Sequence, residues 1–144
     1  MDYMSTVPAT KMLFDTNKTE SLKLLGLEDH PSVQYCAVIG RLFKVHPIFD
    51  EVIVKILQNT NDNTYIVLVA ESVLNINRIL YQRLKKSFNS LDALHLLTRV
   101  KFVDFSHYSH IFNSATCILD TFPYGGCLTT HDAFSNGVPM VTHQ

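Results

Sequence analysis

Paired glycines stand directly before an expected helix near the end of the chain. Gly125 and Gly126 are followed by Thr129 and Thr130, where a helix over 129–136 is predicted to begin. Because glycine has no Cβ, a phosphate can approach the backbone closely, and the free N–H groups and dipole of a helix N-terminus attract its charge. The two threonine hydroxyls add further hydrogen-bond donors. These residues predict a phosphate-binding loop.

Asp132 lies about one turn into the same expected helix. Its carboxylate can accept two hydrogen bonds from the hydroxyls of a ribose. A diphosphate at the helix tip with a ribose one turn along fits a nucleoside diphosphate. The same residues also fit a plain turn in which Thr129 is the N-cap and Asp132 takes a capping-box-like position. The pattern alone leaves both interpretations open.

A second loop, over 40–46, offers positive charge to the same phosphates. It follows an expected strand and contains Arg41 and Lys44, and such cations bind phosphate oxygens. A single lysine in a loop is more often solvated than functional. His107 and His110 precede or open a short expected helix, where surface histidines are the plainer interpretation.

Strands and helices alternate through most of the chain and must position these loops. Apolar and β-branched runs predict strands over 33–39, 65–70, 100–103, 116–119 and 139–142, and helical spacing predicts helices over 47–58, 73–86, 108–114 and 129–136. The run over 65–70 shows no polar alternation, which is typical of a strand covered on both faces. The order predicts an α/β fold, a Rossmann-like doubly wound parallel sheet. Ligands of such sheets bind beyond the carboxyl ends of the strands.

Length and composition indicate one globular lobe. A chain of 144 residues, 47% hydrophobic and 17% charged, is long enough for a single core. Residues 1–30 are mixed and polar, and we expect a loosely ordered leader that ends in a short helix over 20–25. We expect residues 31–144 to form one Rossmann-like nucleotide-binding lobe.

Charge and hydropathy argue against several classes of partner. The formal net charge is -1 and the pI is about 6.6, which gives no basic surface for a nucleic-acid backbone. The longest apolar run, over 65–70, is far shorter than the roughly 20 residues of a membrane span. The N-terminus has no signal-peptide pattern. We expect no nucleic-acid or membrane partner, and a cytoplasmic or nuclear location.

The cysteines and histidines show no spacing typical of metal ligands. Cys36, Cys117 and Cys127 include no C-x-x-C pair, and the seven histidines are scattered. This pattern argues against both a disulfide framework and a zinc site. Cys36 and Cys117 lie in expected strands and are predicted to be small buried hydrophobes. No metal or cofactor is expected.

Separate segments over residues 24–142 resemble one protein family. Leu25-Gly-Leu27, 42–50, 119–133 and 137–142, in this order, resemble the C-terminal catalytic lobe of the O-linked N-acetylglucosamine transferase and SPINDLY family. The resemblance implies one lobe of a GT-B architecture, which pairs two Rossmann-like lobes, usually behind tetratricopeptide repeats. It also implies inverting transfer of a sugar from a nucleotide diphosphate to Ser or Thr hydroxyls of proteins.

The resemblance also assigns roles to individual residues. Lys44 matches the lysine that contacts the donor diphosphate, and we expect it to act in catalysis. Asp132 matches the carboxylate that binds the ribose, and residues 126–130 match the phosphate loop.

The chain departs from the family pattern in several places, including Arg41, which stands where animal members commonly carry a glutamine. Cys127-Leu-Thr stands where animal members usually carry His-Thr-Thr, which removes one imidazole and one hydroxyl contact. The stretch 106–116 is shorter than in the family, so that His107 and His110 are both candidates for the nucleotide-contacting histidine.

From these features we expect the donor-binding part of an inverting protein O-glycosyltransferase. It would move N-acetylglucosamine from UDP-GlcNAc, or fucose from GDP-fucose, to a protein acceptor. The family sequences continue beyond the position of Gln144, so we expect a lobe truncated at its C-terminus and inactive by itself. The alternatives are a non-catalytic nucleotide-binding or interaction module of this family, and a truncated gene model without a function of its own.

Overall fold

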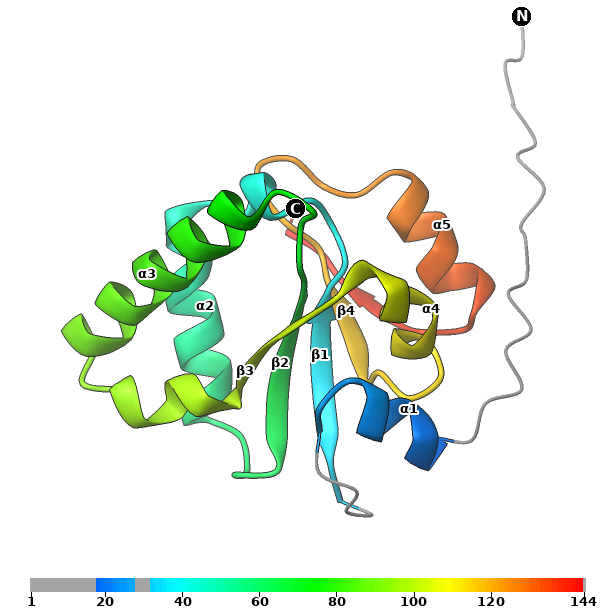
Figure 1. The fold of residues 1–144 in the computed structure, drawn as a ribbon, viewed down its shortest axis with the longest axis horizontal. Helices are drawn as coiled ribbons and strands as arrows, with labels where there is room; N and C mark the ends of the chain where they lie inside the picture. The colour runs from blue at the N-terminus through cyan, green and yellow to red at the C-terminus, as the bar shows by residue number, and fades with distance from the viewer. Residues whose placement is uncertain (1–17, 28–31, 144) are drawn as a thin grey trace, which may run out of the picture.

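The core of the protein is a single parallel sheet. The computed structural model describes residues 18–27 and 32–143 (Figure 1). Five strands pair in the order β3-β2-β1-β4-β5, and each neighbouring pair is parallel. The strands are β1 (Gln34–Val38), β2 (Thr64–Val69), β3 (Val100–Val103), β4 (Cys117–Leu119) and β5 (Met140–Val141).

Helices connect these strands. Within the described residues they are α1 (Lys18–Leu24), α2 (Pro47–Gln58), α3 (Leu74–Ser90), α4 (Tyr108–Ile111) and α5 (Leu128–Ser135), with short 3-10 helices at Leu42–Lys44, Leu94–Arg99 and Phe105–His107. The alternation of strands and helices confirms the predicted α/β class.

Several elements differ in length from the prediction. The helix expected over 73–86 continues to Ser90, because Phe88 on its last turn is fully buried in the core. The helix expected over 108–114 is only Tyr108–Ile111. The strand expected over 139–142 is Met140–Val141, which lies at the sheet edge and pairs with β4 alone.

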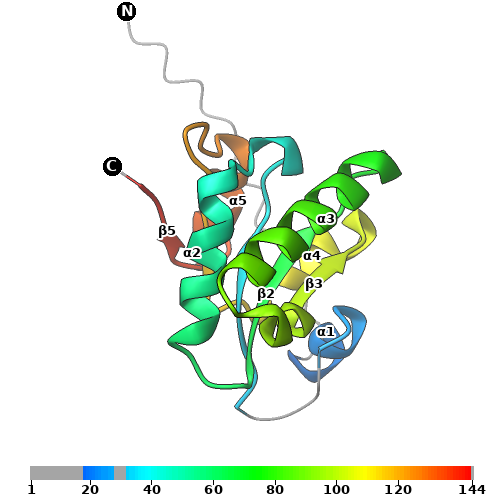
Figure 2. The ribbon, with the colours of Figure 1, turned by 90° about the vertical axis from the view of Figure 1, so that its left-hand side faces the viewer.

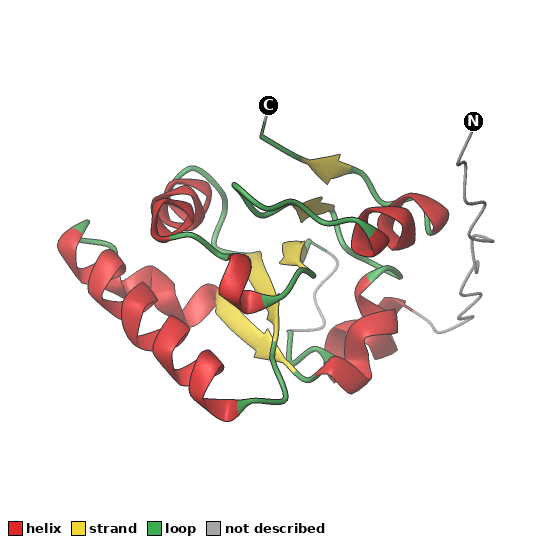
Figure 3. Cartoon of the chain, turned by 90° about the horizontal axis from the view of Figure 1, so that it is seen from above, coloured by secondary structure: helices red, strands yellow, loops and turns green. Residues whose placement is uncertain are grey.

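Apolar cores fill both faces of the sheet. Under α2 and α3 the core includes Ile53 and Leu84, and under α1, α4 and α5 it includes Leu22, Ile111 and Ala133. Figure 2 shows α2 and α3 in front of the sheet, and Figure 3 shows helices on both sides of the strands. The sheet is therefore doubly wound, as predicted.

Helix α1 packs into the second core. Leu22, Leu25 and Leu27 are buried there, and Gly26 ends the helix region with a φ of +68°, a left-handed conformation that glycine adopts without strain. The helix expected at the end of the leader is thus present. Residues 1–17 and 28–31 lie outside the described residues, so the division of the chain at residue 30 stays a prediction.

The strand order has a switch point between β1 and β4. Strands β2 and β3 extend the sheet on one side of β1, and β4 and β5 extend it on the other. Loops that leave β1 and β4 flank the crevice where open α/β sheets bind ligands. Here the loops are close: a Cβ on Gly40 would lie 3.5 Å from the Thr121 hydroxyl oxygen.

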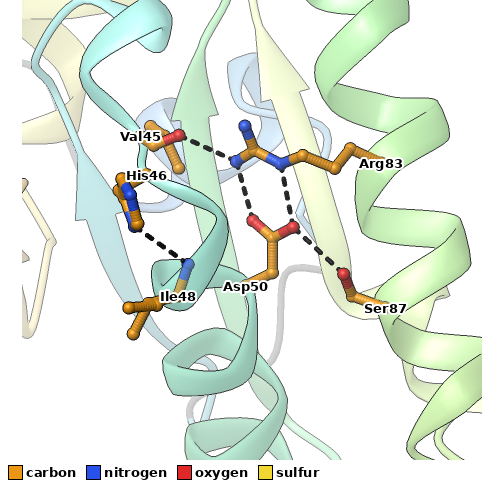
Figure 4. A network of polar contacts seen from close by, with 6 residues as sticks. All are labelled: Val45, His46, Ile48, Asp50, Arg83 and Ser87. Atoms are coloured by element: carbon orange, nitrogen blue, oxygen red, sulfur yellow. Dashed lines mark hydrogen bonds and ion pairs between the residues drawn. The ribbon is translucent and has the colours of Figure 1, made fainter.

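A buried carboxylate ties the first of these loops to two helices (Figure 4). Asp50 of α2 is 0% exposed and accepts hydrogen bonds from Arg83 Nε at 2.9 Å and Nη2 at 2.8 Å. The Ser87 hydroxyl donates to the same carboxylate at 3.1 Å. Arg83 Nη2 also donates to the Val45 carbonyl at 2.8 Å. The backbone next to Lys44 is therefore fixed by the same arginine that neutralises Asp50.

Tyr35 of β1 anchors α4 on the opposite face. Its side chain is buried, and its hydroxyl donates to the Ile111 carbonyl at 2.7 Å and lies 3.1 Å from the Ser114 hydroxyl. Burial raises the pKa of Tyr35 to about 12. The hydroxyl therefore stays protonated and holds the end of α4 against the sheet at neutral pH.

Replacing Arg83 tests whether this network stabilises the fold. Arg83→Met should lower the free energy of unfolding by about 3 kcal/mol, because it leaves the buried Asp50 carboxylate without its cation. Urea denaturation measures the change. Arg78→Met on the exposed side of the same helix is the control and should cost less than about 0.5 kcal/mol. Equal losses in the two variants would show that the network contributes nothing specific.

Candidate functional site

The two predicted loops meet at Lys44. This residue ends the short 3-10 helix after β1, and its Nζ donates a hydrogen bond to the Gly125 carbonyl at 3.2 Å. Residues 81 positions apart are thereby joined across the crevice between β1 and β4. The structure thus places the candidate cation beside the candidate phosphate loop.

Asp120 supports the candidate phosphate loop through two hydrogen bonds. It directly follows β4, and its Oδ1 accepts the Gly126 N–H at 2.7 Å while its Oδ2 accepts the Thr142 hydroxyl at 3.0 Å. The buried Thr121 donates from its hydroxyl to the Tyr124 carbonyl at 2.8 Å. Sequence patterns assign no role to Asp120, because its partners depend on how the loop folds back.

Both glycines are required by the packing of the loop itself. A Cβ on Gly125 would lie 2.8 Å from Asp120 Oδ2, and a Cβ on Gly126 would overlap the Thr129 hydroxyl and lie 3.2 Å from the Thr130 hydroxyl oxygen. Close packing therefore explains the glycines without a ligand, and it also brings the backbone of the loop near the tip of α5.

The start of α5 differs from the plain-turn interpretation. The N-cap is Cys127, which makes no side-chain capping bond, and Thr129 lies inside the helix. The Thr130 hydroxyl donates to the Gly126 carbonyl at 2.9 Å. The first bond of the helix runs from His131 N to Cys127 O at 3.3 Å, so the preceding N–H groups of α5 have no acceptor within the helix. These groups are the donors that the phosphate-loop prediction requires.

Asp132 is held by a residue that sequence reasoning missed. Its Oδ2 accepts the Tyr108 hydroxyl of α4 at 2.8 Å. Burial and the adjacent carboxylate raise the pKa of Tyr108 well above its ordinary range, so the hydroxyl remains a donor. A carboxylate has about four lone-pair sites, so Asp132 keeps capacity to accept ribose hydroxyls. No motif in the sequence links Tyr108 to Asp132.

The remaining candidates are Arg41, His107 and His110. Arg41 pairs with Glu71 at 2.9 Å, and the Leu42 N–H donates to the same carboxylate oxygen at 2.9 Å. Part of the Arg41 charge is therefore already neutralised by the loop after β2. His110 Nδ1 lies 3.4 Å from the Ser21 hydroxyl of α1, and its ring is 6.1 Å from that of His107.

A cavity of about 200 Å³ opens beyond the carboxyl ends of β1 and β2. Its lining includes Gly40, Arg41, Ala70, Glu71 and Phe105. Phe105 is 66% exposed and its ring is stacked on that of Tyr108 at 5.3 Å. An apolar ring, a carboxylate and backbone groups thus line this cavity, which lies on the β2 side of the loop that carries Lys44, and none of its lining residues comes from the loop after β4.

Residues 18–27 and 32–143 contain no group of three or more His, Cys, Asp or Glu side chains placed to hold a metal ion. None of their helices has the length and apolar character needed to cross a membrane.

Comparison with known proteins supports the fold. No family model and no curated protein sequence matches the chain. A solved structure of a mutant O-GlcNAc transferase from Thermobaculum terrenum is similar to it, with a TM-score of 0.62 and 22% sequence identity over 81% of this chain. The chain spans 22% of the length of that protein. At this identity the similarity shows a glycosyltransferase-like Rossmann-type fold.

The loop geometry predicts that substitution by alanine lowers the stability at Gly126 but not at Gly40. Gly126→Ala should lower the free energy of unfolding by about 1 to 3 kcal/mol, because its Cβ overlaps the Thr129 hydroxyl. Gly40→Ala is the matched control in the loop after β1, where the new Cβ makes an ordinary contact and should cost nothing. Adding Thr129→Ala should reduce the loss at Gly126. Thermal or urea unfolding of the variants gives the comparison, and a loss unaffected by Thr129→Ala would refute the proposed overlap.

Proposed function

We propose that this chain binds the diphosphate of a nucleotide sugar between Lys44 and the N-terminus of α5. The observation that carries the proposal is the hydrogen bond from Lys44 to Gly125, which joins the loops after β1 and β4 at the switch point of the sheet. A diphosphate there would accept hydrogen bonds from the Lys44 ammonium on one side and from the free backbone N–H groups of α5 on the other.

The arrangement suits a reaction in which a diphosphate leaves. When a protein hydroxyl displaces the diphosphate from the sugar, negative charge builds on the leaving group in the transition state. Lys44 and the α5 amides are preorganised to stabilise that charge. Asp132, positioned by Tyr108, would bind the ribose of the same nucleotide. These residues supply the positive charge themselves, so the proposed step needs no metal.

The family resemblance extends this proposal to a specific class of enzyme. The motifs around Lys44 and Asp132 resemble those of the O-linked N-acetylglucosamine transferase and SPINDLY family, and a solved O-GlcNAc transferase shares the fold. We propose the donor-binding lobe of an inverting GT-B protein O-glycosyltransferase. The donor is UDP-GlcNAc or GDP-fucose, and the acceptors are Ser or Thr residues of proteins.

Nucleotide binding tests the site directly. Titration calorimetry of the folded chain should detect UDP or GDP, and Lys44→Ala should weaken binding by about tenfold to a hundredfold, since a charge-assisted hydrogen bond is worth about 1.5 to 3 kcal/mol. Lys55→Ala, an exposed lysine of α2, should leave the affinity unchanged. Asp132→Asn should lower the affinity for the nucleotide and leave the affinity for inorganic diphosphate unchanged. The absence of heat with both nucleotides would contradict the proposal.

Sugar transfer is expected only when an opposing lobe completes the cleft. Inverting transfer needs a base within about 3 Å of the acceptor hydroxyl, and a lobe open to water screens the charges around the diphosphate. The 144-residue chain, incubated with radiolabelled UDP-GlcNAc or GDP-fucose and a Ser/Thr-rich acceptor, should therefore bind donor without labelling the acceptor. Label that depends on Asp132 would show that this lobe holds the complete chemistry. If a two-lobed protein that contains this lobe bound the nucleotide but transferred no sugar, the alternative of a non-catalytic nucleotide-binding module would be favoured.

A further inference from the structure

Two cysteines lie in contact inside the sheet. Cys36 of β1 and Cys117 of β4 are register partners on neighbouring parallel strands, which run side by side in Figure 1. A hydrogen bond joins their sulfur atoms, which are 3.3 Å apart. Opposite residues on such strands have Cα atoms about 5 Å apart, within the range of about 4.4 to 6.8 Å seen in disulfides.

The surroundings give the two thiols different properties. Both pack against the apolar core under α2 and α3, as expected of small hydrophobes in strands, but they are half-buried and not fully buried as the sequence predicted. The Cys36 thiol stabilises the thiolate of Cys117 by a hydrogen bond and lowers the pKa of Cys117 to about 7. The same hydrogen bond and burial raise the pKa of Cys36. One nucleophilic sulfur therefore lies beside one protonated partner.

We propose that Cys36 and Cys117 form a redox-active dithiol, which hydroperoxides convert to an intramolecular disulfide between β1 and β4. The Cys117 thiolate attacks the O–O bond and takes one oxygen as a sulfenic acid, while the other oxygen leaves as hydroxide or alkoxide and takes up a proton. The Cys36 sulfur then loses its proton, attacks the sulfenic sulfur and expels water. Overall the two thiols lose two electrons and two protons, and the peroxide is reduced to water, or to water and an alcohol.

This modification site is separate from nucleotide binding. The sulfur pair lies within the strands, whereas Lys44 and Gly125 lie in the loops beyond them. The disulfide would nevertheless link the two strands that flank the switch point of the sheet. Cys127, the remaining cysteine, is exposed at the start of α5, so a reaction at this thiol is distinguishable by peptide mapping.

Mass spectrometry of the full chain tests the proposal. The Cys127→Ser variant is treated with hydrogen peroxide, quenched with iodoacetamide and digested without reduction. We expect an intact mass lower by two hydrogen atoms, peptides of Cys36 and Cys117 linked to each other, and full recovery of both thiols after dithiothreitol. Alkylation of both cysteines after peroxide treatment would overturn the proposal. Sulfinic acid at Cys117 with Cys36 alkylated would also overturn it.

A single-thiol variant tests the assigned order of the two steps. In Cys36→Ser with Cys127→Ser, the sulfenic acid has no resolving thiol, so dimedone should label Cys117. In the reverse variant, Cys117→Ser with Cys127→Ser, dimedone should label Cys36 at least tenfold more slowly. Circular dichroism checks that both variants fold. If either does not fold, the peptide mapping of the Cys127→Ser chain still tests whether the disulfide forms. Equal labelling of the two variants would contradict the role given to Cys117.

Discussion

The buried carboxylate of Asp50 is the constraint on which the geometry of the site depends. A carboxylate removed from water must be neutralised and hydrogen-bonded, and Arg83 and Ser87 of α3 meet this need. The same guanidinium also binds the Val45 carbonyl. Helices α2 and α3 and the loop after β1 therefore share one polar centre. Through it, the packing of two helices determines where Lys44 lies.

The second loop is positioned by a similar but independent centre. Asp120 holds the Gly126 N–H and the Thr142 hydroxyl, and Tyr108 holds Asp132. These bonds tie the end of β4 to its own loop and to the residue after β5, and tie α4 to α5, so the residues around the α5 tip are fixed before any ligand binds. Preorganised donors of this kind stabilise developing charge without rearrangement. The Lys44 to Gly125 contact then brings the two centres together.

Sequence patterns predicted the elements well because those patterns are local. The β-branched run around Val67 and the proline at the start of α2 define β2 and α2 within a residue or so. Pairings between distant segments were not predictable in the same way. The Tyr108 to Asp132 bond, the Arg41 to Glu71 ion pair and the contact between the two strand cysteines all depend on the order of the strands. The ligand roles of Lys44 and residues 125–132 remain predictions.

We propose that a diphosphate binds where the loops after β1 and β4 converge. Nuclear magnetic resonance of the isotopically labelled chain, titrated with UDP and GDP, reports binding at each backbone amide. The largest shifts should fall on residues 125–130 and on the loop around Lys44, with smaller shifts at Asp132 and Tyr108. Shifts confined to other surfaces, such as the exposed side of α3, or no shifts with either nucleotide on the folded chain, would contradict it.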